Sequence, residues 1–386
     1  HAYFKAKRFV EAEEAYRSVL HLPGIEPKFR QDIEENLALS IYNQGLVARA
    51  AQDTDSAMRH YVRVSEALPR SSVAAPALFE AAGLAYDAKL WPQAVGYLET
   101  FRARYPAHNL TRDVAIKLST AYLHTNQEGQ AASELVRLSL ADDNQEYKMA
   151  ALWKAATLYE SAKDFERAAN SYAQYVAAYP RPYPQYLEAL QRLIVLYEQK
   201  GQAAQAYQRR QQLLASDRRA AASQKTERTN YLSSLAALSL ANAERARYAA
   251  IRLTLPLERS LRRKREALQK VLNLYGTATS YGVLETVTEA THAIGEVYYS
   301  FSKDLLASER PKGMSKIEKE QYTVLVEDQA FPFEDNAIKF YEKNLSYAKQ
   351  MGVDRWMRDS HARLKELFPA RYDKNLLVEP YINVLH

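Results

Sequence analysis

The sequence predicts an all-α protein built as an α-solenoid of helical hairpins, followed by a C-terminal helical module. Three observations predict this fold. Alanine, leucine, glutamine, arginine and glutamate dominate the 386 residues, whereas glycine (11) and proline (14) are few. Apolar residues recur at helical spacing, and successive segments end in the same way, at Tyr-Pro or Leu-Pro. These endings return at a nearly fixed interval, which indicates a repeated unit rather than a single closed core.

Four alanines that stand 37 residues apart define the repeat. They are Ala57, Ala94, Ala131 and Ala168, and each is expected to open the second helix of a hairpin. A large residue follows four positions later, at Tyr61, Leu98, Leu135 and Tyr172, and a small one stands twelve positions earlier, at Gly45, Ala82, Ser119 and Ala156. An offset of four places the alanine and the large residue on one helical face, and the small residue lets two helices approach closely.

Proline closes these hairpins. Twelve positions after the alanines stand Pro69, Pro106, Asp143 and Pro180. Proline lacks a backbone donor and moves the residue before it out of the α region, so the second helix of each hairpin is expected to end there. The tyrosines at repeat positions are expected to pack in the core; they are Tyr61, Tyr122, Tyr159, Tyr172 and Tyr175.

The frame of small, aromatic, alanine, aromatic and proline positions over residues 38–180 resembles the tetratricopeptide repeat (TPR). The resemblance implies a right-handed superhelix of hairpins with a concave surface that holds a peptide or another protein. The period of 37 is longer than the usual period of about 34 residues. A longer period with a Tyr-Pro ending is similar to the TPR variant of bacterial envelope proteins, including those associated with the Tol-Pal and outer-membrane assembly systems.

Four regions are expected along the chain. Residues 1–37 hold the end of a truncated repeat and the start of a long helix, and residues 38–216 hold the TPR-like repeats, the last of them degenerate. Residues 217–276 form long basic helices, and residues 277–386 form a C-terminal helical module and tail. The chain begins in mid-pattern with His1 rather than Met, so the sequence is expected to be a piece of a longer protein.

The spacing of apolar residues predicts the helices that come after the repeats. We expect one long helix at 218–254, a second that Pro256 starts at 256–276, and a third at 283–308. A last hairpin is expected at 354–372, and the tail at 375–386 either contacts a neighbour or packs back.

The segment between the third of these helices and the last hairpin contains a start and a stop signal. Ser315 followed by Glu318 is a capping box, which starts a helix. Pro332 is expected to kink or break that helix, with Phe331 and Phe333 packed on either side.

A second resemblance concerns the segment "QAFPFED", the sequence around it and the closing "PARY". These segments are similar to the C-terminal region of large TPR proteins of proteobacteria. Those proteins are linked to TonB- or Tol-like energised systems and to gliding-type motility machinery. The resemblance implies a periplasmic or envelope-associated location and membership of a multiprotein complex.

Positive charge is concentrated in the middle of the chain. Residues 207–270 contain 15 Lys/Arg and 5 Asp/Glu, in a chain of net charge +6. Within this region the run at 262–265 has two interpretations. One is an anionic partner, which could be an acidic protein, a lipid headgroup or nucleic acid; an acidic protein is favoured over nucleic acid because no aromatics are interleaved with this run. The other interpretation is a solvated helix surface, ion-paired to Glu258 and Glu266. The candidate partner-binding cations are Arg209, Arg210, Arg262, Arg263, Lys264 and Arg265.

The last four of these cations are consecutive, so they span more than one helical turn and cannot share one face. Part of that cluster must therefore face neighbouring elements. Tyr183 and Tyr186, beside a proline-rich turn, are further candidates: they form either a contact ridge or a cover for the edge of the solenoid.

No motif predicts catalysis or a cofactor. The sequence contains no GxGxxG, GxxxxGK[ST], HExxH or GxSxG, and it contains no cysteine. The eight histidines are never spaced three or four apart, so no helix offers a paired metal face. No uncharged apolar run approaches 18 residues, so no transmembrane segment is predicted. The lack of cysteine is compatible with an oxidising compartment such as a bacterial periplasm.

The sequence therefore predicts a non-enzymatic scaffold for protein–protein interaction within a bacterial cell-envelope complex. Two alternatives remain open at this point. One is a factor that binds peptidoglycan or another anionic polymer in a basic groove. The other is a helical domain of a larger enzyme whose catalytic part precedes His1.

Overall fold

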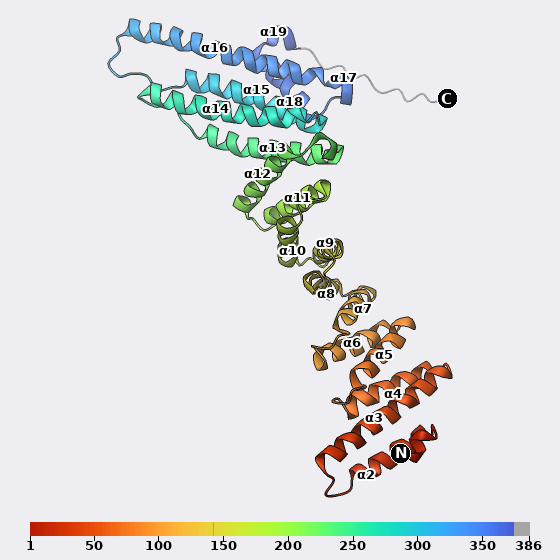
Figure 1. Cartoon of the computed structure of the whole chain (residues 1–386). Coiled ribbons are helices and arrows are strands. Elements are labelled where there is room, and N and C mark those ends of the chain that lie inside the picture. The colour runs from red at the N-terminus through yellow and green to blue at the C-terminus, as the bar shows by residue number, and fades with distance from the viewer. Residues whose placement is uncertain (142, 374–386) are drawn as a thin grey trace, which may run out of the picture. The chain divides into compact units, whose positions relative to one another are not determined.

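The structure is a computed structural model that describes residues 1–141 and 143–373, and these residues contain helices, turns and no strand. The chain divides into two compact units, His1–Tyr179 and Pro180–His386 (Figure 1). Within each unit, a helix packs mainly against the helices before and after it in sequence. This pattern of neighbour contacts is that of a stacked helical array, and it confirms the predicted solenoid.

The first unit is a series of helical hairpins. Its helices are α1 (Ala2–Lys5), α2 (Phe9–Leu20), α3 (Pro27–Ala50), α4 (Thr54–Ala67), α5 (Ala74–Asp87), α6 (Trp91–Arg104), α7 (Thr111–His124), α8 (Glu128–Ala141), α9 (Gln145–Ser161) and α10 (Phe165–Ala178). The four helices that carry the predicted alanines, α4, α6, α8 and α10, each have 14 residues and begin 37 residues apart. The repeat seen in the sequence is therefore a structural repeat of the same length.

The second unit contains longer helices. They are α11 (Tyr183–Gln199), α12 (Ala203–Arg219), α13 (Glu227–Ala249), α14 (Leu257–Ser280), α15 (Leu284–Leu306), α16 (Lys316–Ser346), α17 (Ala348–Met351), α18 (Arg355–Leu367) and α19 (Pro369–Tyr372), with a short 3-10 helix η1 at Ala222–Gln224. The predicted helices at 256–276 and 283–308 correspond to α14 and α15. The predicted tail at 375–386 lies outside the described residues.

Most of the predicted core positions are buried, and Leu135 is half-buried. The four alanines are completely inaccessible, and so are Tyr61, Leu98 and Tyr172, which follow them by four residues. The small position has a steric purpose at Gly45, because a Cβ atom added there would lie 2.6 Å from the ring of Tyr61. The repeat tyrosines Tyr122, Tyr159 and Tyr175 are also buried.

A turn that the sequence pattern did not reveal joins the two helices of each hairpin. It places a non-glycine residue in the left-handed region, at Gln52, Lys89, Asn126 and Lys163, again 37 residues apart, with φ between 56° and 61°. The next residue donates its N–H to the carbonyl five residues back, for example Asp53 to Ala48 at 2.9 Å. This is the Schellman arrangement, which ends the first helix and satisfies its last carbonyls.

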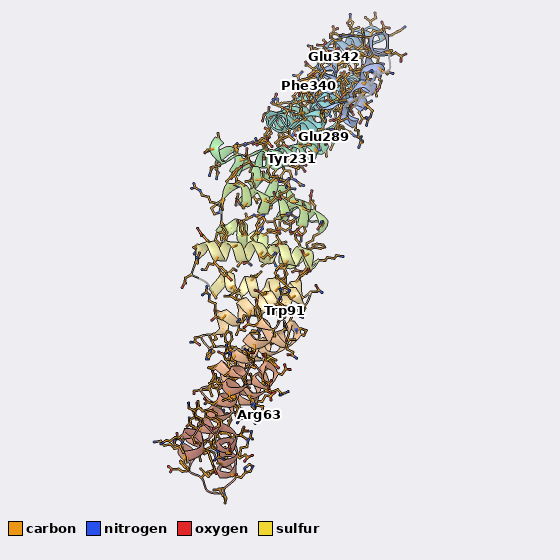
Figure 2. All side chains as sticks on the ribbon, turned by 90° about the vertical axis from the view of Figure 1, so that its right-hand side faces the viewer. Arg63, Trp91, Tyr231, Glu289, Phe340 and Glu342 are labelled. Atoms are coloured by element: carbon orange, nitrogen blue, oxygen red, sulfur yellow. The ribbon has the colours of Figure 1, made fainter. Side chains whose placement is uncertain are left out.

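Buried carboxylates also connect successive hairpins in the first unit. Glu13 of α2 is buried, and it accepts a hydrogen bond from Gln44 of α3 at 2.6 Å. It is also ion-paired with Arg17 of its own helix and with Arg63 of α4 (Figure 2). One charged group thus joins three helices, and its neutralisation by two cations offsets the cost of burying it.

Two predictions about the second unit are wrong. The expected helix at 218–254 is divided, because α12 continues to Arg219 and α13 begins only at Glu227. Thr226 starts α13 by a reciprocal cap in which its side chain accepts from the N–H of Thr229 and its own N–H donates to the Thr229 side chain. Local side-chain capping therefore outweighs the continuous helical pattern.

The second wrong prediction concerns Pro332. Ser315 starts α16 through the predicted capping box, but the helix then runs unbroken through Pro332 to Ser346. The helix persists because Val326, Ala330 and Ala337 are buried along one face of α16, which packs against α15. Phe333 contacts Phe301 of α15 as predicted, whereas Phe331 is 70% exposed.

Candidate functional site

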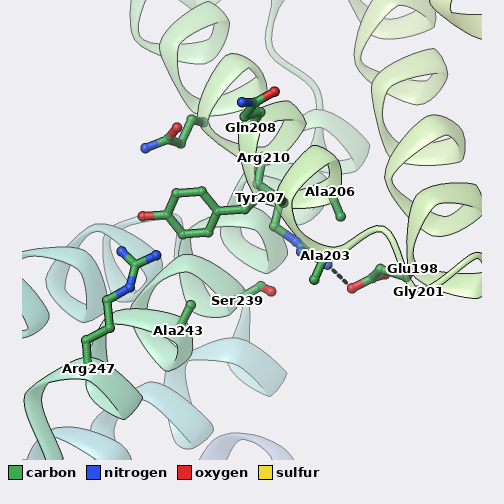
Figure 3. Close-up of a pocket in the computed structure, with 12 residues that line it drawn as sticks. Glu198, Gly201, Ala203, Ala206, Tyr207, Gln208, Arg210, Ser239, Ala243 and Arg247 are labelled. Atoms are coloured by element: carbon green, nitrogen blue, oxygen red, sulfur yellow. Dashed lines mark hydrogen bonds and ion pairs between the residues drawn. The ribbon is translucent and has the colours of Figure 1, made fainter. Parts of the chain in front are cut away.

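A hollow along α12, α13 and α14 of the second unit is the candidate site. Its main cavity, of about 670 Å³, lies between α12 and α13 (Figure 3). Two smaller cavities of about 220 and 320 Å³ extend it toward α14. Each pair of cavities has a lining residue in common: Tyr207 lines the first and second, Arg247 the first and third, and Lys270 the second and third. The cavities therefore adjoin one another, and we call them together the basic groove.

Small and apolar side chains form the floor of the basic groove. Ala203 and Ala206 of α12 and Ala243 of α13 line the main cavity (Figure 3). The second cavity is lined by Leu240 of α13 and Leu274 of α14. Alanine leaves space between two packed helices where a larger residue would fill it, so this surface can accept apolar side chains of another molecule.

A buried carboxylate organises the polar part of the basic groove. Glu244 of α13 is 5% exposed. It accepts hydrogen bonds from the Tyr207 hydroxyl at 2.8 Å, from Arg247 at 2.5 Å and from Lys270 Nζ, on α14, at 2.9 Å. Burial opposes the ionisation of Glu244, but the hydrogen bonds from Lys270 and Tyr207 hold its pKa below its usual range. One ionised carboxylate thus positions two cations, and the cluster carries net positive charge.

The orientation of Arg247 is also fixed by an aromatic ring. Its guanidinium lies 5.2 Å from the ring centroid of Tyr207, and Figure 3 shows the two side chains pointing toward one another. Such a cation–π contact restrains the arginine while its side chain remains 63% exposed. Arg247 is therefore both held in place and available to an anionic group from outside.

Cations outnumber acids around the basic groove. Its cationic residues are Arg210, Arg218, Arg247, Arg263 and Lys270, and its acidic residues are Glu198, Glu244 and Glu266. Arg210 is neutralised by an ion pair with Glu198 (Figure 3). Arg218 and Arg263 are exposed and make no ion pair within the described part of the chain. The groove thus combines an apolar floor with a positive rim.

Of the predicted partner-binding cations, the structure brings two into the basic groove, Arg210 and Arg263. Arg209 bonds Gln212 at 2.7 Å on its own helix. Arg262 pairs with the exposed Glu258 at 3.0 Å, as the solvated interpretation of the cluster predicted. Arg265 is exposed and does not line the groove. The consecutive cations therefore point in different directions, as their helical spacing requires.

The prediction that Lys264 binds a partner is wrong, and Lys264 is the part of the cluster that faces neighbouring elements. Its side chain is 1% exposed, donates to the carbonyl of Ile251 at 2.6 Å, pairs with Asp304 of α15 at 2.5 Å and lies over the ring of Tyr248. The physical reason is its register on α14. It precedes the buried Leu268 and Val271 by four and seven residues, so it belongs to the inward face.

Tyr183 and Tyr186 correct the prediction of a contact ridge, because both are buried on α11. The Tyr183 hydroxyl donates to Asp217 of α12 at 2.7 Å, and the Tyr186 hydroxyl accepts from Gln212 at 3.0 Å. Asp217 also accepts from Tyr281 at 2.8 Å. The two tyrosines hold α11 on α12, which agrees with the alternative that they cover an edge of the solenoid.

Three residues at the centre of the basic groove were missed from sequence: Tyr207, Glu244 and Lys270. A weak signal was present, because Glu244 interrupts the apolar face of the Ala/Leu-rich segment that became α13. A buried acid in such a face needs cationic partners. The partners lie on other helices, 37 and 26 residues away, so the sequence pattern could not identify them.

The described residues were also searched for metal-binding groups and for membrane-spanning helices. Searched over the described ranges, no three His, Cys, Asp or Glu side chains come close enough to hold a metal ion. None of the helices described is both long and apolar enough to cross a membrane.

Comparison with known families assigns one repeat. Residues 150–181, which cover most of α9 and all of α10, match the tetratricopeptide repeat. No curated protein gives a significant match to the chain. The fold and this match together define the class of protein: an α-solenoid of helical hairpins that contains a tetratricopeptide repeat.

Similar solved structures include three proteins of low sequence identity. The crystal structure of MamA is 20% identical and covers 47% of this chain and 92% of its own, with a TM-score of 0.27. YrrB, described as a TPR protein with an unusual peptide-binding site, is 18% identical to this chain. The match covers 49% of this chain and 91% of YrrB, with a TM-score of 0.29. A chain of the Naa15/Naa10 complex bound to HypK-THB is 15% identical to this chain. The match covers 95% of this chain and 62% of the other, with a TM-score of 0.31. All three TM-scores lie below 0.5.

Proposed function

We propose that this chain is a non-enzymatic protein-interaction scaffold that holds an acidic segment of a partner protein in the basic groove. The observation that carries the proposal is the cluster around Glu244, in which a buried carboxylate fixes two cations beside an apolar floor. Stacked helical hairpins present extended surfaces of this kind, and such surfaces commonly bind peptides. A segment with alternating carboxylates and small apolar side chains matches both the rim and the floor.

The basic groove favours an acidic protein segment over nucleic acid. The aromatic ring at its centre, Tyr207, is covered on one side by Arg247 and bonded through its hydroxyl to Glu244. Arg247 thus occupies a face of the ring on which a base would otherwise stack. The apolar floor also has no counterpart in a phosphate backbone.

We further propose that the scaffold belongs to a multiprotein complex of the bacterial cell envelope, in the periplasm or attached to it. The support is in the sequence: the 37-residue period with Tyr-Pro endings, the "QAFPFED" segment and the absence of cysteine. Fractionation of cells that express the full-length protein tests the location. Recovery in the cytoplasmic fraction would leave the scaffold proposal standing and overturn the location.

Fluorescence anisotropy with a short labelled peptide rich in glutamate and leucine tests the groove directly. The informative variant is Arg218→Glu combined with Arg263→Glu, because both cations are exposed and line the groove. We expect it to weaken binding by about tenfold or more, since like charges facing each other cost several kcal/mol. Added salt should weaken binding of the unsubstituted chain.

The matched control is Arg219→Glu combined with Arg262→Glu. These residues adjoin the first pair in sequence and are also exposed, but neither lines the groove. The control therefore makes the same change in net charge and should bind normally. Equal loss in both variants would indicate attraction to overall charge and contradict the groove. If the chain instead retained only isolated cell-wall glycan, the polymer-binding alternative would replace the proposal.

A further inference from the structure

The outer face of α16 carries a line of large apolar side chains. Ile317, Val324 and Phe331 stand seven residues apart, which is nearly two helical turns, so they lie along one side of the helix. They are 67%, 56% and 70% exposed. The residues that bury α16 against α15, such as Val326 and Ala330, lie on the opposite side. We call Ile317, Val324 and Phe331 the outer stripe.

No described residue packs over the outer stripe. Figure 1 shows α16 at the edge of its unit, with α15 on one side. The hydrogen bonds that α18 and α19 make to α16 fall at its other end, on Asn344 and Glu342. Helical arrays normally end in a polar outer face, and contiguous exposed apolar side chains on soluble proteins mark interaction sites. The outer stripe therefore needs an occupant.

The charge beside the outer stripe defines the chemistry of that occupant. The segment from Lys316 to Asp335 contains six acidic residues and two lysines. Within the described ranges Asp335 is ion-paired with Lys339, and Glu318 accepts from the N–H of Ser315 in the capping box. The other four acids, Glu320, Glu327, Asp328 and Glu334, make no ion pair there. An apolar line flanked by free carboxylates fits a surface that is apolar in the middle and basic at the rim.

A second copy of α16 does not meet this requirement. If two α16 helices paired in antiparallel fashion about Val324, then Glu320 of one copy would face Asp328 of the other. Like charges placed directly opposite destabilise such a pair. Pairing through the same face on both copies is therefore disfavoured, and the complementary surface must be a different one.

The basic groove is that complementary surface. Its floor of Ala203, Ala206 and Leu240 suits apolar side chains, and its rim carries the exposed cations Arg218 and Arg263. The α16 helix packs along α15 and makes no substantial contact with α12 or α13, so it cannot enter the groove of its own chain. The fit is available only between two molecules.

We propose that the outer stripe of one copy of this chain docks in the basic groove of a second copy. The inference rests on the proposed function, because it assigns to the same groove an acidic apolar segment supplied by the chain itself. The two surfaces are different, so the contact is heterologous: copies add head to tail unless the rotation closes a ring. Self-association then competes with an external partner for the groove.

Sedimentation velocity of the full chain over a range of concentrations tests the proposal. We expect association that grows with concentration and weakens with salt. Phe331→Asp should abolish it, because a charge would replace the most exposed apolar residue of the outer stripe. The matched control is Leu140→Asp, a substitution of an equally exposed apolar residue on α8, which should leave association unchanged. Circular dichroism should show unaltered helix content in both variants.

A mixing experiment distinguishes the two sides of the contact. The Phe331→Asp variant keeps an intact groove, and the Arg218→Glu, Arg263→Glu variant keeps an intact outer stripe. Each should be monomeric alone, and together they should form a complex of two molecules that grows no further. Association of either variant alone, or no complex in the mixture, would overturn the proposal.

Failure of this inference can be told from failure of the proposed function. The Phe331→Asp variant should still bind the labelled acidic peptide. If it does so while the unsubstituted chain stays monomeric at every concentration, the self-docking is wrong and the groove is retained. If self-association appears only after residues 374–386 are removed, that segment occupies the outer stripe in the intact chain, and the proposal is also overturned.

Discussion

The contact between Gly45 and Tyr61 shows how closely the helices of a hairpin approach. The ring of Tyr61 is completely buried and lies where a side chain at position 45 would begin. The same contact recurs between Gly295 of α15 and Tyr341 of α16, where an added Cβ atom would lie 2.5 Å from the ring. Ala337, which precedes Tyr341 by four residues, is also completely buried. The α15–α16 hairpin therefore keeps the packing frame of the repeats although it lies outside their 37-residue register.

We predict that Gly45→Ala lowers the free energy of unfolding by about 1–3 kcal/mol, because a fully buried tyrosine ring cannot move away from the added methyl group without strain. Gly83→Ala is the matched control. Gly83 lies inside α5 with no atom within 4 Å of an added Cβ, so alanine should be neutral or stabilising there. Urea unfolding followed by circular dichroism measures both. Equal effects of the two substitutions would contradict the steric explanation.

His292 makes the second unit sensitive to acid. It lies buried between α15, α16 and α18, bonded to the Ser360 hydroxyl at 2.9 Å and packed against the rings of Tyr341 and Trp356. Burial lowers its pKa below the ordinary value of 6.5, although the nearby Glu296 and Asp359 oppose the shift. The folded state therefore favours the neutral imidazole.

We predict that stability falls as the pH drops below about 6.5, because the unfolded chain then binds a proton that folded His292 does not. The contribution is complete above that pH and is lost toward the lower pKa of the folded state. His292→Gln, which keeps a side chain able to bond Ser360, should make unfolding less dependent on pH over this range. His21→Gln, the same substitution at an exposed histidine of the first unit, is the control. Urea midpoints measured across this range provide the test.

At the scale of single elements, α16 shows how tertiary packing outweighs a local signal. A proline inside a helix leaves the carbonyl four residues earlier without its donor, and here that carbonyl belongs to Asp328. The helix persists because α15 packs along its inner face on both sides of Pro332. The proline side chain is exposed, so its ring displaces no core residue.

We predict that Pro332→Ala raises the free energy of unfolding by up to about 3 kcal/mol. Alanine supplies the backbone N–H that proline lacks, and its helix propensity is higher than that of proline. Pro27→Ala is the control. Pro27 is the first residue of α3, where the N–H has no partner within the helix, so its replacement should change stability little. A decrease on Pro332→Ala would show that the proline has a role that α16 itself does not explain.

At the scale of the whole molecule, stability is expected to be local. Each helix packs mainly on its neighbours in sequence, and each of the two units has its own buried core. In such arrays a destabilised hairpin affects the adjacent hairpins more than distant ones. Mutational effects should therefore remain within the unit that carries the change.

Hydrogen exchange followed by mass spectrometry tests this expectation. Gly45→Ala should speed amide exchange in α3 and α4 and leave α15 and α16 unchanged. Gly295→Ala, which creates the equivalent clash with Tyr341, should do the reverse. Faster exchange in both units after either substitution would indicate global cooperativity and contradict the prediction.

The sequence alone determined the helical hairpins, their 37-residue period and the buried positions, because each of these depends on neighbours within a few turns of helix. Ala57 and Tyr61 face the core through an offset of four, and the proline at 69 ends the helix that carries them. The same local reasoning also predicted the capping box at Ser315.

Only the tertiary structure decided which charges meet. Lys264 and Arg263 are adjacent in sequence, yet one pairs with Asp304 inside the protein and the other lines the basic groove. Glu244 obtains its partners from α12 and α14. Such contacts depend on how separate helices stack, and the free energy of a buried charge depends on those contacts rather than on residue type. For that reason the sequence located the basic region of this protein, and the stacking of α12, α13 and α14 made it a groove.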